Sequence, residues 1–163
     1  MSITRFFFLF SFLLLSAAFA AAKSMPSQFQ CRVIHISDGD TFTCLSGNNK
    51  RIKVRLLGID APENGQAYAN KAKQFLAQLI HKQSVTLKID GIDQYARRLA
   101  TVYDSRQRNI NLLMIENGWA WAYRFYKKDP RYPQAQRSAQ MKKAGLWQDD
   151  KPQEPYLWRK QQR

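Results

Sequence analysis

Hydrophobic and polar residues alternate along much of the chain in the pattern of short, half-buried strands. In the segment 51–57, for example, Lys53 and Arg55 alternate with three aliphatic residues, which is the two-residue period of a strand with one face in a core. The same pattern, read with the turn-forming residues between the runs, predicts five strands, at residues 29–36, 41–45, 51–57, 84–89 and 98–103.

The pattern changes to a helical period between residues 66 and 81. Apolar residues recur there at intervals of three and four, which indicates an amphipathic helix. A short helix is predicted at 111–117, ended by Gly118. A third is predicted within 133–145, where proline begins the segment and glycine ends it. We expect the residues from Lys151 onward to form an irregular extension.

Five strands with a helix before the fourth are compatible with an OB-fold, a five-stranded Greek-key barrel. The pattern permits this fold but does not require it. The chain has no internal repeat and no linker long enough to divide it. We therefore expect a single α+β domain over residues 21–163, with a core at about 30–147 and a C-terminal extension at 148–163.

The first 20 residues have the pattern of an export signal. Arg5 supplies a positive start, residues 6–15 are almost wholly apolar, and Ala18-Phe19-Ala20 is a small-x-small cleavage site. The apolar run is shorter than the roughly 20 residues that span a bilayer. We therefore expect cleavage after Ala20 and a secreted or periplasmic protein, with an uncleaved N-terminal anchor as the alternative.

The chain is strongly basic. Its formal net charge is +14, to which the first 20 residues contribute only Arg5. Such an excess favours nucleic acid or another anionic surface as the partner. The basic residues are dispersed, with a denser run at 124–143, which is more typical of a domain with a basic face than of a disordered tail.

The two cysteines of the chain, Cys31 and Cys44, lie on either side of a predicted hairpin. An export signal implies an oxidising compartment, so we expect a disulfide between them. The alternative is a pair of small buried thiols, which is a common environment for cysteine.

Three carboxylates and an arginine lie in two short motifs. The motif DGDT carries Asp40, and the motif VRLLGIDAPE carries Arg55, Asp60 and Glu63. Antiparallel pairing around the turn at 47–49 places Asp40 near the end of the strand that bears Arg55, so the acidic residues are expected to converge. Converging carboxylates repel one another unless a cation neutralises them, and oxygen ligands suit Ca²⁺. A guanidinium suits phosphate.

Three motifs together resemble the staphylococcal nuclease (thermonuclease) family: DGDT at 38–41, VRLLGIDAPE at 54–63 and DQYARRLA at 93–100. The resemblance implies a five-stranded OB-fold β-barrel with about three helices. It also implies an endonuclease that uses Ca²⁺ to cleave DNA and RNA with little sequence preference, leaving 3′-phosphate ends. We expect a monomer with no stable membrane association after signal cleavage.

The resemblance further implies roles for the acidic motif residues. Asp40 and Asp60 correspond to carboxylate ligands of Ca²⁺, and Ala61 to a ligand that acts through its backbone carbonyl. The model enzyme of the family has threonine at that place, so a hydroxyl contact is lost here. Glu63 corresponds to the residue that positions or deprotonates the attacking water. Taken alone, it could be a salt-bridged surface glutamate.

Two arginines correspond to the phosphate-binding residues of the family, Arg55 and Arg97. An offset of one would exchange Arg97 with Arg98, but Tyr95, two positions earlier, favours Arg97. Tyr95 and Tyr123 are expected near the substrate, although Tyr123 matches a family tyrosine only if one gap is allowed. Each of these arginines could also be an ordinary solvated charge.

Two other functions remain open from sequence. One is a non-catalytic OB-fold module that binds nucleic acid, and the other is a basic protein that coats an anionic cell surface. The complete set of acidic residues and arginines favours the enzyme.

Overall fold

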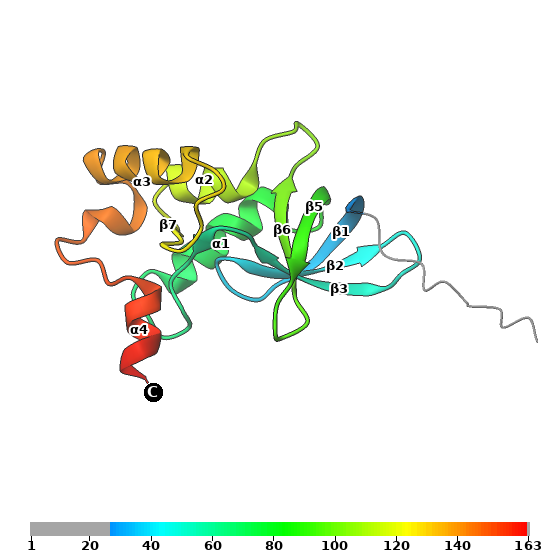
Figure 1. The fold of residues 1–163 in the computed structure, drawn as a ribbon, viewed down its shortest axis with the longest axis horizontal. Helices are drawn as coiled ribbons and strands as arrows, with labels where there is room; N and C mark the ends of the chain where they lie inside the picture. Colours follow the sequence, from blue (N-terminus) through cyan, green and yellow to red (C-terminus); the bar gives the residue numbers. More distant parts are fainter. Residues whose placement is uncertain (1–26, 163) are drawn as a thin grey trace, which may run out of the picture.

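The barrel predicted from the strand pattern is present. The structure, a computed structural model, describes residues 27–162, and a closed five-stranded barrel forms its centre (Figure 1). The strand order is β1-β2-β3-β6-β5, with all pairs antiparallel except β3 and β6. The strands are β1 (Gln28–Ile36), β2 (Thr41–Ser46), β3 (Arg51–Leu56), β5 (Ser84–Ile92) and β6 (Arg98–Tyr103).

Four α-helices accompany the barrel in the described part of the chain, one more than predicted. They are α1 (Ala69–Ile80), α2 (Ile110–Glu116), α3 (Arg131–Met141) and α4 (Pro155–Gln161), with a short 3-10 helix, η1 (Gly145–Gln148). In Figure 1, α1, α2 and α3 lie together on one side of the barrel, and α4 stands apart at the end of the chain. A small second sheet pairs β4 (Ile59–Asp60) with β7 (Trp121–Ala122).

The helices differ from the prediction in their bounds and in number; for example, α2 begins and ends one residue earlier than predicted, and α3 ends at Met141, before Gly145. The first helix begins at Ala69 rather than Gln66, because Tyr68 takes a left-handed backbone conformation, with φ 68°. The helix α3 begins two residues before Pro133, and a proline is tolerated there because the N–H groups of the first turn have no intrahelical partner. The expected irregular extension was wrong, since residues 155–161 form α4 with Pro155 at its start.

The core of the barrel is built from the alternating apolar positions of the strands. The side chains of Val33, Phe42 and Val54 are fully buried, as the two-residue period predicts for one face of each strand. On α1, Leu76 and Ile80 lie four residues apart and are also fully buried, so the helical stripe faces the barrel.

A buried amide joins the helices to the barrel beside the second motif. The side chain of Asn111 in α2 accepts a hydrogen bond of 3.0 Å from the N–H of Val102. Its amide nitrogen donates to the carbonyls of Leu57, at 2.9 Å, and Ala100, at 3.0 Å. Asn111 is fully buried with its polar atoms satisfied, which is the condition under which a buried amide stabilises a fold. It fixes the segment that leads into β4 and Asp60.

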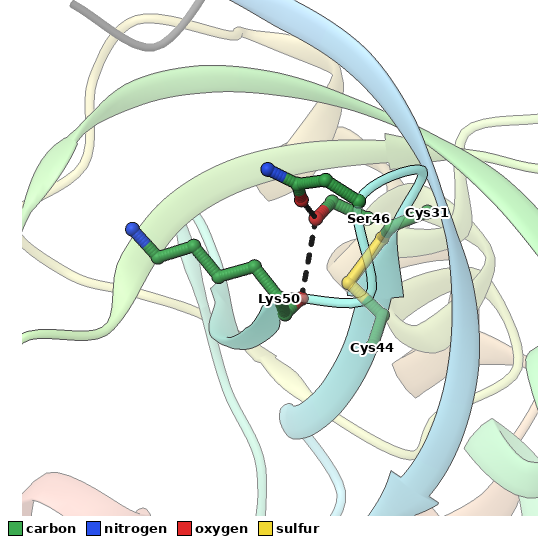
Figure 2. The surroundings of a disulfide bond; sticks show 5 residues. Cys31, Cys44, Ser46 and Lys50 are labelled. Carbon is green, nitrogen blue, oxygen red and sulfur yellow. Dashed lines mark hydrogen bonds between the residues drawn. A yellow bond between two sulfur atoms is a disulfide. The ribbon is translucent and has the colours of Figure 1, made fainter.

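The predicted partners Cys31 and Cys44 are joined by a disulfide between β1 and β2, with their Cα atoms 5.7 Å apart (Figure 2). Both residues are buried. Beside the disulfide, the hydroxyl of Ser46 donates to the carbonyl of Lys50 at 3.3 Å and contacts Asn48, which closes the turn between β2 and β3.

The predicted signal peptide, residues 1–20, lies outside the described residues. Within residues 27–162, none of the helices is both long enough and apolar enough to cross a membrane.

Candidate active site

The residues of the three motifs meet at a cavity of about 630 Å³. Its walls come from the DGD turn, the end of β3, the segment from β3 to Glu63 and the loop between β5 and β6. The charged and aromatic lining residues are Asp38, Asp40, Arg55, Glu63, Asp93, Tyr95, Arg97, Tyr123 and Arg159. Asp60 is almost fully buried and contacts two of these residues, Arg55 and Arg159.

The position of Asp40 follows from strand pairing, as predicted. Thr41 pairs with Arg55 in the β2–β3 register, and the N–H of Leu56 donates to the carbonyl of Asp40 at 2.8 Å. The Asp40 carboxylate accepts hydrogen bonds from the N–H of Ala61, at 2.9 Å, and from the hydroxyl of Thr41, at 3.1 Å. Asp40 is therefore fixed in place and only 6% exposed.

The first residue of the DGD turn also faces the cavity. Asp38 accepts a hydrogen bond of 2.9 Å from the N–H of Asp40, which closes the turn. Burial raises the pKa of Asp38 to about 6, and the nearby charge of Asp40 acts in the same direction. Burial beside another carboxylate therefore makes the charged form of Asp38 less favourable than that of an exposed aspartate.

Arg55 bridges the two predicted metal-ligand carboxylates. Its Nη1 lies 2.8 Å from Oδ2 of Asp40, and its Nη2 lies 3.0 Å from Oδ1 of Asp60. Nη1 also donates to the carbonyl of Ile59 at 3.1 Å. Burial lowers the pKa of Arg55, but the charges of Asp40 and Asp60 outweigh that effect and raise it overall. Arg55 therefore stays positively charged.

A second arginine, which the sequence reasoning missed, also contacts Asp60. Arg159 in α4 donates from Nη1 to Asp60 Oδ1, at 3.0 Å, and from Nη2 to Asp60 Oδ2, at 2.9 Å. Its Nη1 also donates to Glu63 Oε1 at 2.6 Å. Burial raises the pKa of Asp60, and the hydrogen bonds from Arg159 and the charge of Arg55 oppose that rise.

Gln66 holds the loop that carries Glu63. Its Oε1 accepts a hydrogen bond of 2.9 Å from the N–H of Glu63, and its Nε2 donates to the carbonyl of Gln153 at 2.6 Å. Gln66 is buried. The prediction placed this residue only at the start of a helix, and no local pattern marked its contact with a residue 87 positions later.

Arg97 is held by an acidic residue of its own loop. Its Nε donates to Oδ2 of Asp93 at 2.7 Å, and its backbone N–H donates to Oδ1 at 3.0 Å. Nη1 donates to the hydroxyl of Thr41 at 3.3 Å, which brings Arg97 next to the DGD turn. Arg97 lines the cavity, whereas Arg98 pairs with Val54 inside the barrel sheet. Of these two neighbouring arginines, Arg97 is thus the one that can contact a ligand in the cavity.

Two tyrosines lie at the edge of the cavity. Tyr95 is 66% exposed, and the guanidinium of Arg97 lies 5.4 Å from the centre of its ring. Tyr123 donates its N–H to the carbonyl of Gly58 at 2.9 Å, and its ring packs edge-on against Phe125. An exposed ring beside a basic side chain, as at Tyr95, is suited to stacking with nucleobases; Tyr123 is only half-buried.

The donor set fits a hard cation only with additional ligands. Within residues 27–162, no three or more histidine, cysteine, aspartate or glutamate side chains are arranged to hold a metal by themselves. Ca²⁺ takes six to eight oxygen ligands and accepts carbonyls and water among them. Asp60 and Glu63 already share one positive group, the guanidinium of Arg159. A dication at these oxygens would take the place of that guanidinium as the neutralising charge.

Residues 53–149 match the family described as Staphylococcal nuclease homologue. The chain belongs to this family. The match contains Arg55, Asp60, Glu63 and Arg97, and it ends before α4 begins. The resemblance inferred from the three motifs is confirmed, and so is the α+β fold with its OB-type barrel.

Named relatives of this staphylococcal nuclease homologue cover most of the chain. An uncharacterized endonuclease of Haemophilus influenzae is 53% identical over 133 residues, or 82% of this chain and 74% of that protein. Micrococcal nuclease of Shigella flexneri is 40% identical over 157 residues, or 89% of this chain and 90% of that protein. Protein ParB of Escherichia coli is 36% identical over 155 residues, or 89% of this chain and 87% of that protein.

Proposed function

We propose that this nuclease is a calcium-dependent endonuclease that hydrolyses phosphodiester bonds of DNA and RNA with little sequence preference. The observation that carries the proposal is the convergence of two arginines and three carboxylates around one cavity: Arg55, Arg97, Asp40, Asp60 and Glu63. The relatives named micrococcal nuclease and endonuclease support the same activity.

The two arginines supply the positive charge that phosphodiester hydrolysis needs. Arg55 and Arg97 contact the phosphoryl oxygens, on which negative charge increases as water attacks in line. The hydrogen bond from Arg97 to Asp93 restrains the guanidinium at the cavity and supports this role. Each contact of this kind typically contributes about 3 kcal/mol to transition-state stabilisation, or roughly a hundredfold in rate.

Glu63 positions the attacking water or removes its proton. Its side chain is 39% exposed and lines the cavity, so water can reach it. A general base must lie within hydrogen-bonding reach of the proton it takes, and the hydrogen bond from the Glu63 N–H to Gln66 holds the backbone at this point.

Asp40, Asp60 and the backbone carbonyl of Ala61 would hold the cation. When bound, Ca²⁺ would neutralise charge on the phosphoryl group. The basic surface of the chain attracts the polyanionic substrate without regard to sequence, and Tyr95 and Tyr123 offer ring faces to any base. Both features favour a nuclease of low specificity.

Digestion of plasmid DNA and of RNA tests this function. We expect the full exported chain to cut both substrates with Ca²⁺ and to lose activity when a chelator is added. The variants Glu63→Gln and Arg97→Ala should cut at least about a hundredfold more slowly, whereas the surface variant Arg137→Ala should match the parent. DNA binding without cleavage at any Ca²⁺ concentration would favour the non-catalytic OB-fold module instead.

The dependence on Ca²⁺ concentration separates the metal ligands from the other residues. Asp40→Asn removes a charged ligand, so added Ca²⁺ should recover part of its turnover. Glu63→Gln and Arg97→Ala should stay slow at saturating Ca²⁺, because they lack a base and a phosphoryl contact. Recovery of all three variants by Ca²⁺ would contradict these assignments.

We also infer that the nuclease is exported to the periplasm or the exterior after cleavage behind Ala20. The sequence of residues 1–20 and the Cys31–Cys44 disulfide support export to an oxidising compartment. Intact-mass measurement of the protein from the exported fraction should give a chain that begins at Ala21. A full-length chain in the membrane fraction would support the anchor instead.

A further inference from the structure

A side chain from the last helix, Arg159, pairs with two acidic residues of the candidate site, Asp60 and Glu63. Both carboxylate oxygens of Asp60 accept hydrogen bonds from Arg159, and so does one oxygen of Glu63. Asp60 is 1% exposed. Both oxygens of Asp60, one of the proposed Ca²⁺ ligands, are thus already paired with a positive group of this chain.

The helix that carries Arg159 is held in place by contacts outside the cavity. Glu154, at its start, is 8% exposed and pairs with Arg124, whose Nε donates to Oε1 at 2.8 Å. The ring of Tyr156 packs against Phe125, with the ring centres 5.4 Å apart, and the guanidinium of Arg124 lies 4.8 Å from the Tyr156 ring. Tyr156 and Arg159 are three residues apart and so share one side of the helix. The contacts of Tyr156 therefore orient Arg159 as well.

A third contact connects the helix to the loop of Glu63. The carbonyl of Gln153 accepts a hydrogen bond from Gln66, whose other amide atom binds the N–H of Glu63. The start of α4 and the Glu63 loop therefore share one buried side chain. The position of Arg159 is set by an organised segment rather than by the two carboxylates alone.

A guanidinium and a dication cannot use the same oxygens together. A carboxylate has about four acceptor positions, and those of Asp60 serve Arg159 twice and Arg55 once. Two positive charges at this distance repel, and the repulsion is strong where the surroundings are buried. Cation binding therefore requires Arg159 to leave Asp60.

We propose that Arg159 is an internal competitor of the cation, so that α4 sets the Ca²⁺ concentration at which the site is occupied. This inference rests on the proposed Ca²⁺ site at Asp40 and Asp60. Arg159 is 34% exposed, so its side chain can move outward.

Calcium titration by calorimetry on the full exported chain, without nucleic acid, tests the competition. Arg159→Gln should bind Ca²⁺ about tenfold more tightly or better, since it removes charged hydrogen bonds that the cation must break. The control is Lys160→Gln, which makes the same charge change in the same helix. The Lys160 amine lies 5.0 Å from the Tyr156 ring, so its contact is with that ring. It should bind Ca²⁺ as the parent does.

A second variant keeps the test decisive if Arg159→Gln folds poorly. Glu154→Gln removes the ion pair that seats α4 without changing any residue of the cavity, and it should also tighten Ca²⁺ binding, by a smaller factor. Equal affinity of the parent and both variants would overturn the competition, and so would weaker binding by Arg159→Gln.

The same measurements distinguish failure of the proposed calcium site from failure of the competition alone. If the parent, Arg159→Gln and Glu154→Gln all lack Ca²⁺ binding while each is folded, then the calcium site itself is wrong, and the competition fails with it. A parent that binds Ca²⁺ and cuts DNA, with the same affinity as Arg159→Gln, would reject only the competition.

Discussion

The N–H of Ala61 donates a hydrogen bond of 2.9 Å to Oδ2 of Asp40 and so joins two motifs that lie 21 positions apart. Both residues are almost fully buried. Gly39, beside Asp40, makes this approach possible: a Cβ at position 39 would lie 2.7 Å from the Cβ of Ala61 and 2.8 Å from that of Ala72. The glycine of the DGD turn therefore has a packing role, because its lack of a side chain leaves room for Ala61 and Ala72.

Replacement of that glycine should destabilise the protein. Gly39→Ala adds a methyl group where two neighbouring Cβ atoms leave no room, so we expect the free energy of unfolding to fall by about 1–3 kcal/mol. Urea denaturation measures this change. Gly47→Ala is the matched control, because a Cβ there meets no atom within 4 Å, and its effect should stay within about 0.5 kcal/mol. Equal stability of the two variants would contradict the packing argument.

The strands and the convergence of the acidic residues were predictable because both depend on local patterns. The two-residue period sets which strand face is buried, and the turn at 47–49 sets the β2–β3 register. That register alone brings Asp40 beside Arg55. Once the strands pair, the chain length between Arg55 and Glu63 leaves little freedom for the acidic segment.

The rest of the site depends on contacts that a sequence pattern does not contain. Helix α4 has seven residues, and an isolated helix of that length is unstable in water. Its ion pair with Arg124 spans 30 positions, and the contact from Arg159 to Asp60 spans 99. Pro155, at the first position of the helix, was the one local signal available.

The pair Asp93–Arg97 should act as one unit in catalysis. Asp93→Asn removes the charged partner of Arg97 without touching the substrate, so we expect turnover to fall by between about tenfold and a hundredfold, with KM less affected. In the double variant with Arg97→Ala, turnover should be no lower than in Arg97→Ala alone. Asp90→Asn is the control, because Asp90 pairs with Lys128 outside the cavity. Independent, additive losses in the double variant would reject the positioning role.

The disulfide should contribute strongly to stability. Cys31 and Cys44 are 13 positions apart, and closing a loop of this length is worth about 3 kcal/mol on the chain-entropy model. Reduction of the parent should lower the free energy of unfolding by that amount. The double variant Cys31→Ala/Cys44→Ala should be less stable than the oxidised parent and should not respond to the reductant. A parent that is equally stable with and without reductant would contradict this prediction.

Asp104 should stabilise the protein at neutral pH and lose this effect in acid. Its carboxylate accepts bonds from Arg108 Nε, at 2.7 Å, and from the N–H groups of Arg106 and Arg108. Burial acts to raise the pKa of Asp104, but these hydrogen bonds outweigh it and lower the pKa overall. Because the folded-state pKa lies below the unfolded value of about 3.9, the stabilisation is present above about pH 4. It is lost as pH falls through the folded-state pKa.

The matching measurement is urea denaturation of Asp104→Asn beside the parent at pH 7, 5 and 3. The variant should be less stable by about 1–2 kcal/mol at pH 7 and pH 5, and the difference should shrink at pH 3. The control is Asp150→Asn, since Asp150 is exposed, and it should match the parent throughout. If the stability difference between the parent and Asp104→Asn instead grew as the pH fell, the prediction would be contradicted, because a lowered carboxylate pKa stabilises only above that pKa.

The family match ends at residue 149, yet a side chain that touches two of the acidic residues comes from residue 159. The boundary of the family match and the boundary of the segment that contacts the candidate site are therefore different. A shortened version that stops at the end of the match would lack both Arg159 and the carbonyl that holds Gln66. A bulky fusion at the C-terminus would press on the same helix. Tags for purification, immobilisation or imaging are therefore expected to disturb the candidate site less when they precede the barrel than when they follow α4.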